Sequence, residues 1–233
     1  MRPSTVRAAS WIASGPAAWA GYTWGAHVLA LAGGGTWRGR TPERRVALTF
    51  DDGPDPEWTP RVLDILAGEG VRGSFFLVGR RAAAIPSLAR RIAEEGHDVG
   101  NHTWAHRSLW LLGPRATRRE VRDGHLAVSQ ASGTAPRFFR APWGMINLAL
   151  FPILRALRTP CVFWSVQPEG LRAAGGALQI ARAVRRCHPG AIIGLHDANG
   201  VPGAGRRLLD ALPGLIRHLR DGGYAFSPLR DLL

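Results

Sequence analysis

Short apolar segments alternate with amphipathic segments along most of the chain. Brief apolar runs of this kind are typical of buried strands, whereas apolar positions that recur every three or four residues are typical of helices packed on a sheet. The predicted strands cover residues 46–50, 73–78, 98–100, 137–139, 162–164 and 191–195. The predicted helices cover residues 59–70, 87–96, 117–131, 147–157, 177–184 and a last stretch around 208–219.

This alternation predicts a parallel sheet with helices outside it, in either a barrel or an open doubly wound form. In both architectures the chemistry gathers at the carboxyl ends of the strands. Polar side chains stand just after several predicted strands: Asp51 and Asp52, His102, Arg140, and His196. We therefore expect these five side chains to converge on one rim of the sheet.

The N-terminal segment differs from the rest of the chain. Residues Ala8 to Trp37 carry no formal charge unless His27 is protonated. This outline favours a signal peptide or a membrane anchor over the alternative, an apolar helix packed on the domain. We therefore divide the chain into an apolar segment, 1–40, and a catalytic domain, 41–233. Because every motif follows the segment, we do not expect it to contribute to the catalytic rim.

Composition indicates one globular domain. The chain has 233 residues, of which 45% are hydrophobic and 20% charged, and its formal charge is +13. All 30 basic residues are arginine, but they are scattered and no run interleaves them with stacking aromatics, so we do not predict nucleic acid as a partner. The two cysteines, Cys161 and Cys187, indicate no disulfide framework. The sequence does not indicate an oligomeric state.

Two segments together predict a metal site. His102 and His106 are four residues apart, so a helical turn would place both imidazoles on one face. Asp51 and Asp52 are adjacent, so on an extended backbone their side chains point in opposite directions and can do different work. Two nitrogens with the oxygen of Asp52 would leave a coordination position for water, which is the pattern of a catalytic zinc site.

Four motifs carry a family resemblance: Thr49-Phe-Asp-Asp-Gly-Pro54, His102-Thr-Trp-Ala-His106, Arg140-Ala-Pro-Trp143 and Leu195-His196. In order and spacing, from about Arg45 to the C-terminus, they resemble the polysaccharide deacetylases of carbohydrate esterase family four, which include the chitooligosaccharide deacetylases. The resemblance implies an α/β fold, a distorted (β/α) barrel of about seven parallel strands. It also implies an N-acetylglucosamine-type polymer as substrate and a divalent metal ion, with Zn²⁺ as the first choice.

The resemblance also implies residue roles. Asp52, His102 and His106 would be the metal ligands, Asp51 the general base and His196 the general acid. Such roles suit the chemistry, because an amide needs an activated water and its amine must leave protonated.

Four further residues receive supporting roles from the same resemblance. Arg140 would pair with Asp51, Pro142 and Trp143 would wall the sugar groove, and Leu195 would line the pocket for the acetyl methyl group.

One motif departs from the family pattern. An Asp-x-x-Asp-Trp element is expected after the strand at 162–164, and its carboxylate orients the catalytic histidine. Gln167, Gly170 and Leu171 stand at those three positions. Glu169 is either a substitute orienter or a loop residue in water, and the sequence leaves both readings open.

The leading hypothesis is a metal-dependent hydrolase that removes N-acetyl groups from an N-acetylglucosamine-containing polysaccharide, in an extracytoplasmic or membrane-associated location. The alternative is a catalytically weakened relative that binds glycan. Nucleic-acid binding would rest on net charge alone and ranks last. Whether the polymer is chitin-like, peptidoglycan or an exopolysaccharide stays open.

Overall fold

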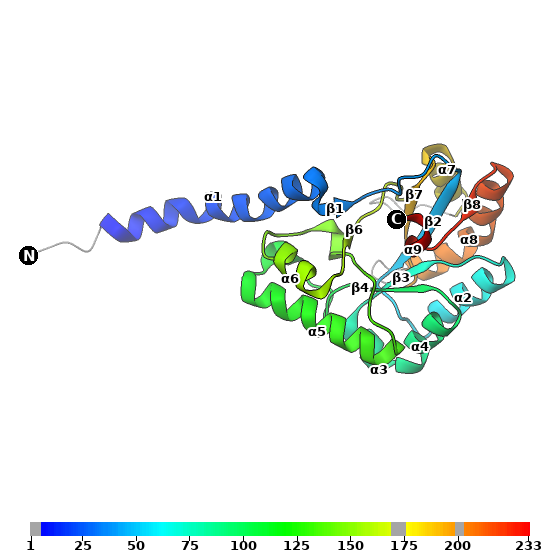
Figure 1. Cartoon of the computed structure of the whole chain (residues 1–233), viewed down its shortest axis with the longest axis horizontal. Coiled ribbons are helices and arrows are strands. Elements are labelled where there is room, and N and C mark those ends of the chain that lie inside the picture. The colour runs from blue at the N-terminus through cyan, green and yellow to red at the C-terminus, as the bar shows by residue number, and fades with distance from the viewer. Residues whose placement is uncertain (1–5, 169–175, 199–202) are drawn as a thin grey trace, which may run out of the picture.

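The computed structural model describes residues 6–168, 176–198 and 203–233, and Figure 1 shows how their elements are arranged. Seven strands run parallel in the order β1-β6-β5-β4-β3-β2-β7. A short β8 pairs in parallel with β2. An isolated parallel bridge joins Val166, in the segment after β6, to Ile193 of β7, so the two sides of the sheet approach each other. The predicted distorted barrel of about seven strands is therefore confirmed, and the open doubly wound alternative is excluded.

The strands are β1 (Gly35–Thr36), β2 (Arg45–Asp51), β3 (Ser74–Leu77), β4 (Asp98–Asn101), β5 (Phe138–Phe139), β6 (Cys161–Val162), β7 (Ala191–His196) and β8 (Ala225–Phe226). The α-helices are α1 (Val6–Leu29), α2 (Thr59–Gly68), α3 (Gly79–Ala84), α4 (Pro86–Glu94), α5 (Pro114–Ser132), α6 (Leu150–Leu157), α7 (Gly176–Arg186), α8 (Ala204–Asp221) and α9 (Leu229–Leu232). Short helical turns are η1 (Ala30–Gly34), η2 (Leu109–Leu111) and η3 (Pro142–Gly144). Every predicted strand and helix is present with bounds shifted by a few residues, whereas α3, α9, β1 and β8 were not predicted.

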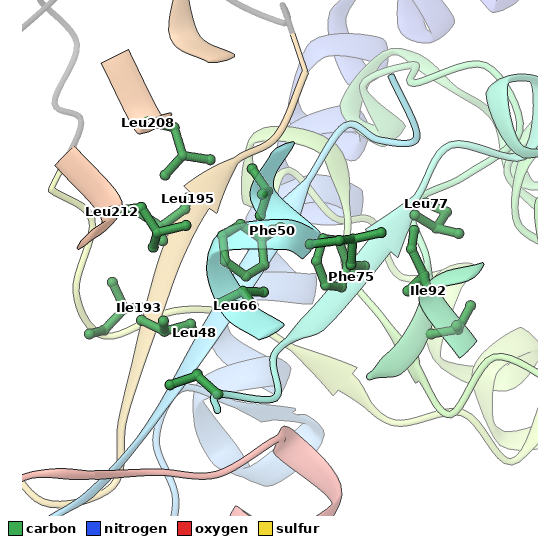
Figure 2. Close-up of a cluster of buried hydrophobic side chains, with 14 of the residues drawn as sticks. Leu48, Phe50, Leu66, Phe75, Leu77, Ile92, Ile193, Leu195, Leu208 and Leu212 are labelled. Atoms are coloured by element: carbon green, nitrogen blue, oxygen red, sulfur yellow. The ribbon is translucent and has the colours of Figure 1, made fainter. Parts of the chain in front are cut away.

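Alternation along the strands builds two separate cores. On β2, Leu48 and Phe50 point outward and pack with residues of α2 and α8, whereas Ala47 faces the barrel interior. Figure 2 shows the outer cluster, in which Leu195 of β7 lies beside Leu212 of α8. Burying each such side chain contributes on the order of 1.5–3 kcal/mol. The sheet therefore offers a rigid frame on which the loops after the strands are mounted.

A buried histidine makes this frame sensitive to acid. His97 lies at the start of β4, and its Nδ1 accepts a hydrogen bond of 3.0 Å from the amide N–H of Gly73. Burial lowers the pKa of His97 from 6.5 to about 4. Between about pH 4 and pH 6.5, the unfolded chain therefore carries a proton on this histidine that the folded chain does not carry. The contribution to stability is complete above pH 6.5 and is lost as the pH falls from 6.5 towards 4.

We expect the free energy of unfolding to fall by about 2 kcal/mol between pH 8 and pH 5 because of His97 alone. His97→Asn keeps an acceptor for Gly73 and removes the titrating ring, so its unfolding free energy should fall less over this interval. Urea unfolding at both pH values measures the difference. Equal pH slopes for the two proteins would contradict the assignment.

The C-terminal half of α1 packs on the domain. Ala26 and Ala30 are fully buried in a third cluster that includes Leu109 and Ile146. The chain then enters the sheet as β1, beside β6. Figure 1 shows the first half of α1 extending away from the rest of the molecule. Across the described residues, no helix combines the length and apolarity needed to cross a membrane. The division at residue 40 stays a prediction, but the sheet begins before it.

Candidate active site

The two aspartates end β2 and face different partners. Asp51 is the last strand residue, and its carboxylate accepts a hydrogen bond from Arg140. Asp52 follows with a φ of +76°, in the left-handed region that few side chains adopt, and its carboxylate turns towards the histidine loop. A side chain at Gly53 would lie 2.6 Å from the Asp197 carboxylate, so glycine is required for this turn. This geometry fits the two predicted roles, in which Asp51 is the general base and Asp52 is a metal ligand.

The Asp197 carboxylate lies directly against Gly53 in this turn. It is fully buried, and the hydroxyl of Thr59 donates a hydrogen bond to Oδ2 at 2.5 Å. Burial, together with the nearby charges of Asp52 and Asp51, raises the pKa of Asp197 to about 7. The amide of Asp197 also donates a hydrogen bond of 3.3 Å to the carbonyl oxygen of Asp51, so this residue supports the backbone that carries the predicted base and the predicted metal ligand.

The histidine loop follows β4, and it is not helical. Thr103 and His106 have φ angles of +67° and +55°, so the chain makes a tight bend between the two imidazoles. Glu120 of α5 holds the bend, because its Oε2 accepts a hydrogen bond of 2.9 Å from the amide of Ala105. The expectation of a helical turn is therefore wrong, although both rings still reach the same point.

Three side-chain atoms converge there. The Nε2 atoms of His106 and His102 lie 2.8 and 3.4 Å from Oδ1 of Asp52. Ligand atoms of the three residues all lie within 4.8 Å of one another, a spacing that could hold a metal ion. The Nδ1 atom of His102 lies 2.8 Å from the carbonyl oxygen of Arg140. A proton on Nδ1 would fix the ring and leave Nε2 as the ligand atom.

The electrostatics of Asp52 suit a cation. Despite the short contacts, Oδ1 has no partner of hydrogen-bond geometry among the described residues, and it is buried. Burial by itself favours the neutral acid, but the two imidazoles outweigh it and hold the pKa of Asp52 well below its usual range. The ionised form is the one that binds metal.

Arg140 is fully buried and satisfies most of its guanidinium with hydrogen bonds. Its Nη1 donates to Thr49 at 2.7 Å and to Asp51 at 2.8 Å, while Nη2 and Nε donate to the carbonyl oxygens of Phe163 and Val162. Burial lowers the pKa of Arg140, which the carboxylate of Asp51 opposes. A buried charge is stable only when it is paired in this way. Sequence reasoning quoted Thr49 within a motif but gave it no role.

The remaining predicted residues do not all gather at this point. His196 ends β7 directly opposite Asp51 in the sheet register. Trp143 is 60% exposed, and its ring centroid lies 4.5 Å from that of His106, while Pro142 beside it is buried. Leu195 is 1% exposed on the outer face of β7, in the cluster of Figure 2. Its predicted role in an acetyl pocket stays untested.

Glu169 lies outside the described residues, and so do Gly170 and Leu171. The orienting role predicted for Glu169 therefore stays a prediction. Sequence reasoning missed Glu120, since a lone acidic residue on a helix carries no pattern that marks it. It placed Asp197 at the rim beside His196 and named it as a further candidate to orient that histidine, but not as a neighbour of the Gly53 turn.

Comparison with known proteins agrees with this arrangement. The family model for polysaccharide deacetylases matches residues 38–162, more than half of the chain. This chain belongs to the polysaccharide deacetylase family. A chitooligosaccharide deacetylase of Bradyrhizobium sp. is 36% identical to it over 199 residues, which cover 81% of this chain and 90% of that protein. A peptidoglycan-N-acetylglucosamine deacetylase of Bacillus cereus is 33% identical over 80% of this chain and 67% of its own length.

Solved structures of polysaccharide deacetylases share the fold. A peptidoglycan N-acetylglucosamine deacetylase in complex with 4-naphthalen-1-yl-N-oxidanyl-benzamide is 30% identical, with a TM-score of 0.82 over 89% of this chain and 96% of its own. A pseudoenzyme of carbohydrate esterase family four from Bacillus anthracis is 25% identical, with a TM-score of 0.77 over 85% and 68% of the two chains. A mutant of that pseudoenzyme with restored enzymatic activity is 26% identical, with a TM-score of 0.77 over 85% and 70%.

Proposed function

We propose that this family member is a metal-dependent N-deacetylase of an N-acetylglucosamine-containing polysaccharide. The observation that carries the proposal is the convergence of Asp52, His102 and His106 beside the Asp51–Arg140 pair. We take Zn²⁺ as the ion, since two imidazole nitrogens and one carboxylate oxygen leave coordination positions open for water and substrate. When bound, such an ion would polarise the acetyl carbonyl group and lower the pKa of water to about 7.

The roles of the protein side chains follow from their positions. Asp51 is held by Arg140 and takes a proton from the attacking water. The water oxygen bonds to the carbonyl carbon, and the carbon–nitrogen bond then breaks. His196, opposite Asp51 on β7, donates a proton to the departing nitrogen. The products are acetate and a free amino sugar.

The substrate class that we propose for this protein is based on the substrates named for its relatives. Both curated relatives are named as deacetylases, one of a chitooligosaccharide and one of peptidoglycan N-acetylglucosamine. Trp143 is exposed beside His106, where it can pack against a sugar ring. We therefore propose that the protein works on a cell-wall or chitin-like polymer outside the cytoplasm.

Acetate release tests the proposal. The protein is stripped with a chelator, supplied with Zn²⁺, Co²⁺ or Ni²⁺, and incubated with N-acetylglucosamine oligomers or with peptidoglycan. We expect acetate from at least one glycan, only when metal is added. Release that is indifferent to the chelator, or no release from any glycan with any metal, would refute the proposal.

A glycan-binding role without turnover is the second candidate. It is favoured by Gln167, which stands where the family places a carboxylate, and by the similarity to a pseudoenzyme. The presence of Asp51, Arg140 and His196 favours turnover instead. Glycan binding without acetate release would decide for this second candidate.

A further inference from the structure

The rim that carries the metal site continues onto the N-terminal helix. Trp143 lies against His106, and the carbonyl oxygen of the next residue, Gly144, lies 3.2 Å from Nε2 of His27 on α1. The carbonyl oxygen of Tyr22 accepts a hydrogen bond of 3.0 Å from the amide of Leu148. The N-terminal helix therefore packs against the segment that carries Trp143, while the expectation that it contributes nothing to the catalytic rim stays a prediction.

Two more indole rings extend this rim. The His27 ring stands edge-on to Trp110 at 5.6 Å, and Trp110 lies 5.2 Å from Trp24. The indoles of Trp24 and Trp110 meet at 58° and so form an angled pair. A continuous series of contacts thus joins His106, a predicted metal ligand, to Trp24, although 82 positions separate them in the sequence.

The α1 part of this aromatic face carries no formal charge, and the face is partly open to solvent. Trp24 and Trp143 are each 60% exposed, and Leu148, which hydrogen-bonds to Tyr22 of α1, is 41% exposed. No formally charged residue occurs between Ala8 and Trp37. Exposed apolar surface of this kind marks an interaction site in a soluble domain. The face therefore fits a neutral ligand with apolar faces.

Pyranose rings have that character. Their axial C–H groups carry slight positive charge and pack on the electron-rich face of an indole, while their hydroxyl groups stay in water. The continuity of the face with the rim selects one source for such rings, the same polymer that reaches Asp52 through Trp143. A lipid surface would also accept exposed tryptophans, but it offers no reason for their connection to the metal loop.

We propose that Trp24 and Trp110 form a sugar-binding subsite for units of the polysaccharide beyond the one that is deacetylated. The inference rests on the proposed function for the identity of the polymer. It implies that the protein prefers chains of several sugar units to short fragments. Trp24 of α1 is thus a specificity residue that lies outside the barrel.

Kinetics on oligomers of two lengths test the subsite. In Trp24→Ala we expect KM for a six-unit N-acetylglucosamine oligomer to rise about two- to tenfold, because the lost aromatic contact is of that size. KM for the two-unit oligomer and kcat for both should stay unchanged. Trp24→Tyr keeps a ring and should restore most of the loss. Trp19→Ala is the matched control, since Trp19 is on the same helix, is 43% exposed and contacts Tyr22 instead.

Calorimetric binding of the six-unit oligomer separates this inference from the proposed function. If the wild type binds the oligomer more tightly than Trp24→Ala, the subsite is supported even where no acetate is released. Equal affinities and equal KM values would overturn it, and so would an equal loss in Trp19→Ala. Loss of binding to phosphatidylglycerol vesicles in Trp24→Ala, with the oligomer unaffected, would also overturn it and assign the face to lipid.

Discussion

Asp52→Asn should lower the affinity for Zn²⁺ at least a hundredfold and reduce acetate release to background. Among the three described side chains that could hold the ion, the substitution removes the one carboxylate and leaves two imidazoles. Losing an outer partner of a metal ligand already costs about 10–100-fold in affinity, and loss of a ligand should cost more. Asparagine is the right replacement, because it tolerates the left-handed backbone at this position.

Calorimetric titration of the metal-free protein with Zn²⁺ measures this effect without any substrate. Asp55→Asn is the matched control, because it removes the same charge three residues later. The Oδ1 atom of Asp55 accepts hydrogen bonds from the amides of Glu57 and Trp58, and an asparagine oxygen can accept the same bonds. Wild-type affinity in Asp52→Asn would show that the converging atoms do not hold the ion.

His196→Ala should lower the turnover number by about 10²–10⁴-fold and leave zinc affinity near the wild-type value. The reason is position: His196 lies opposite Asp51 in the register of β7 and β2, whereas the three converging ligand atoms belong to other residues. The departing amine nitrogen then lacks its proton donor. Acetate release under saturating oligomer, combined with zinc titration, separates the two effects.

Added imidazole should restore part of the activity of His196→Ala, because a small acid can enter the vacated space. His218→Ala serves as the control, since His218 is exposed on α8 and its Nδ1 lies 2.7 Å from the carbonyl oxygen of Gly214 on the same helix. If the turnover number of His196→Ala falls by less than tenfold, or if its zinc affinity falls in parallel, His196 is not the general acid.

The alternative hypothesis, a catalytically weakened relative that binds glycan, predicts different results for Asp52→Asn and His196→Ala. A pseudoenzyme of the same family whose mutant regains activity shows that the fold tolerates loss of turnover. If the wild type already releases little acetate, His196→Ala will change the rate little, while Asp52→Asn will still lose zinc. The two variants together therefore separate a metal-binding glycan receptor from an enzyme.

The sequence by itself determined most of the elements and which of the predicted metal ligands meet at the rim. Apolar runs and helical periodicity report the burial of local segments, so the strands from β2 to β7 and the helices between them could be placed. Because parallel strands present their carboxyl ends to one edge, Asp52 and His102 were predicted to meet, and their ligand atoms do converge. The order of the motifs identified the family.

Only the tertiary structure decided how those residues are held. The bend at Thr103 and His106 depends on Glu120, which α5 brings from another part of the chain. Leu195 faces α8 because the pleat of β7 turns His196 to the opposite side. The docking of α1 against the Trp143 turn left no signal in the sequence, since a uniformly apolar helix has no marked face. The periodicity of apolar residues shows which face of a segment is buried. It does not show which other segment packs on that face, because that is fixed only when the sheet curls.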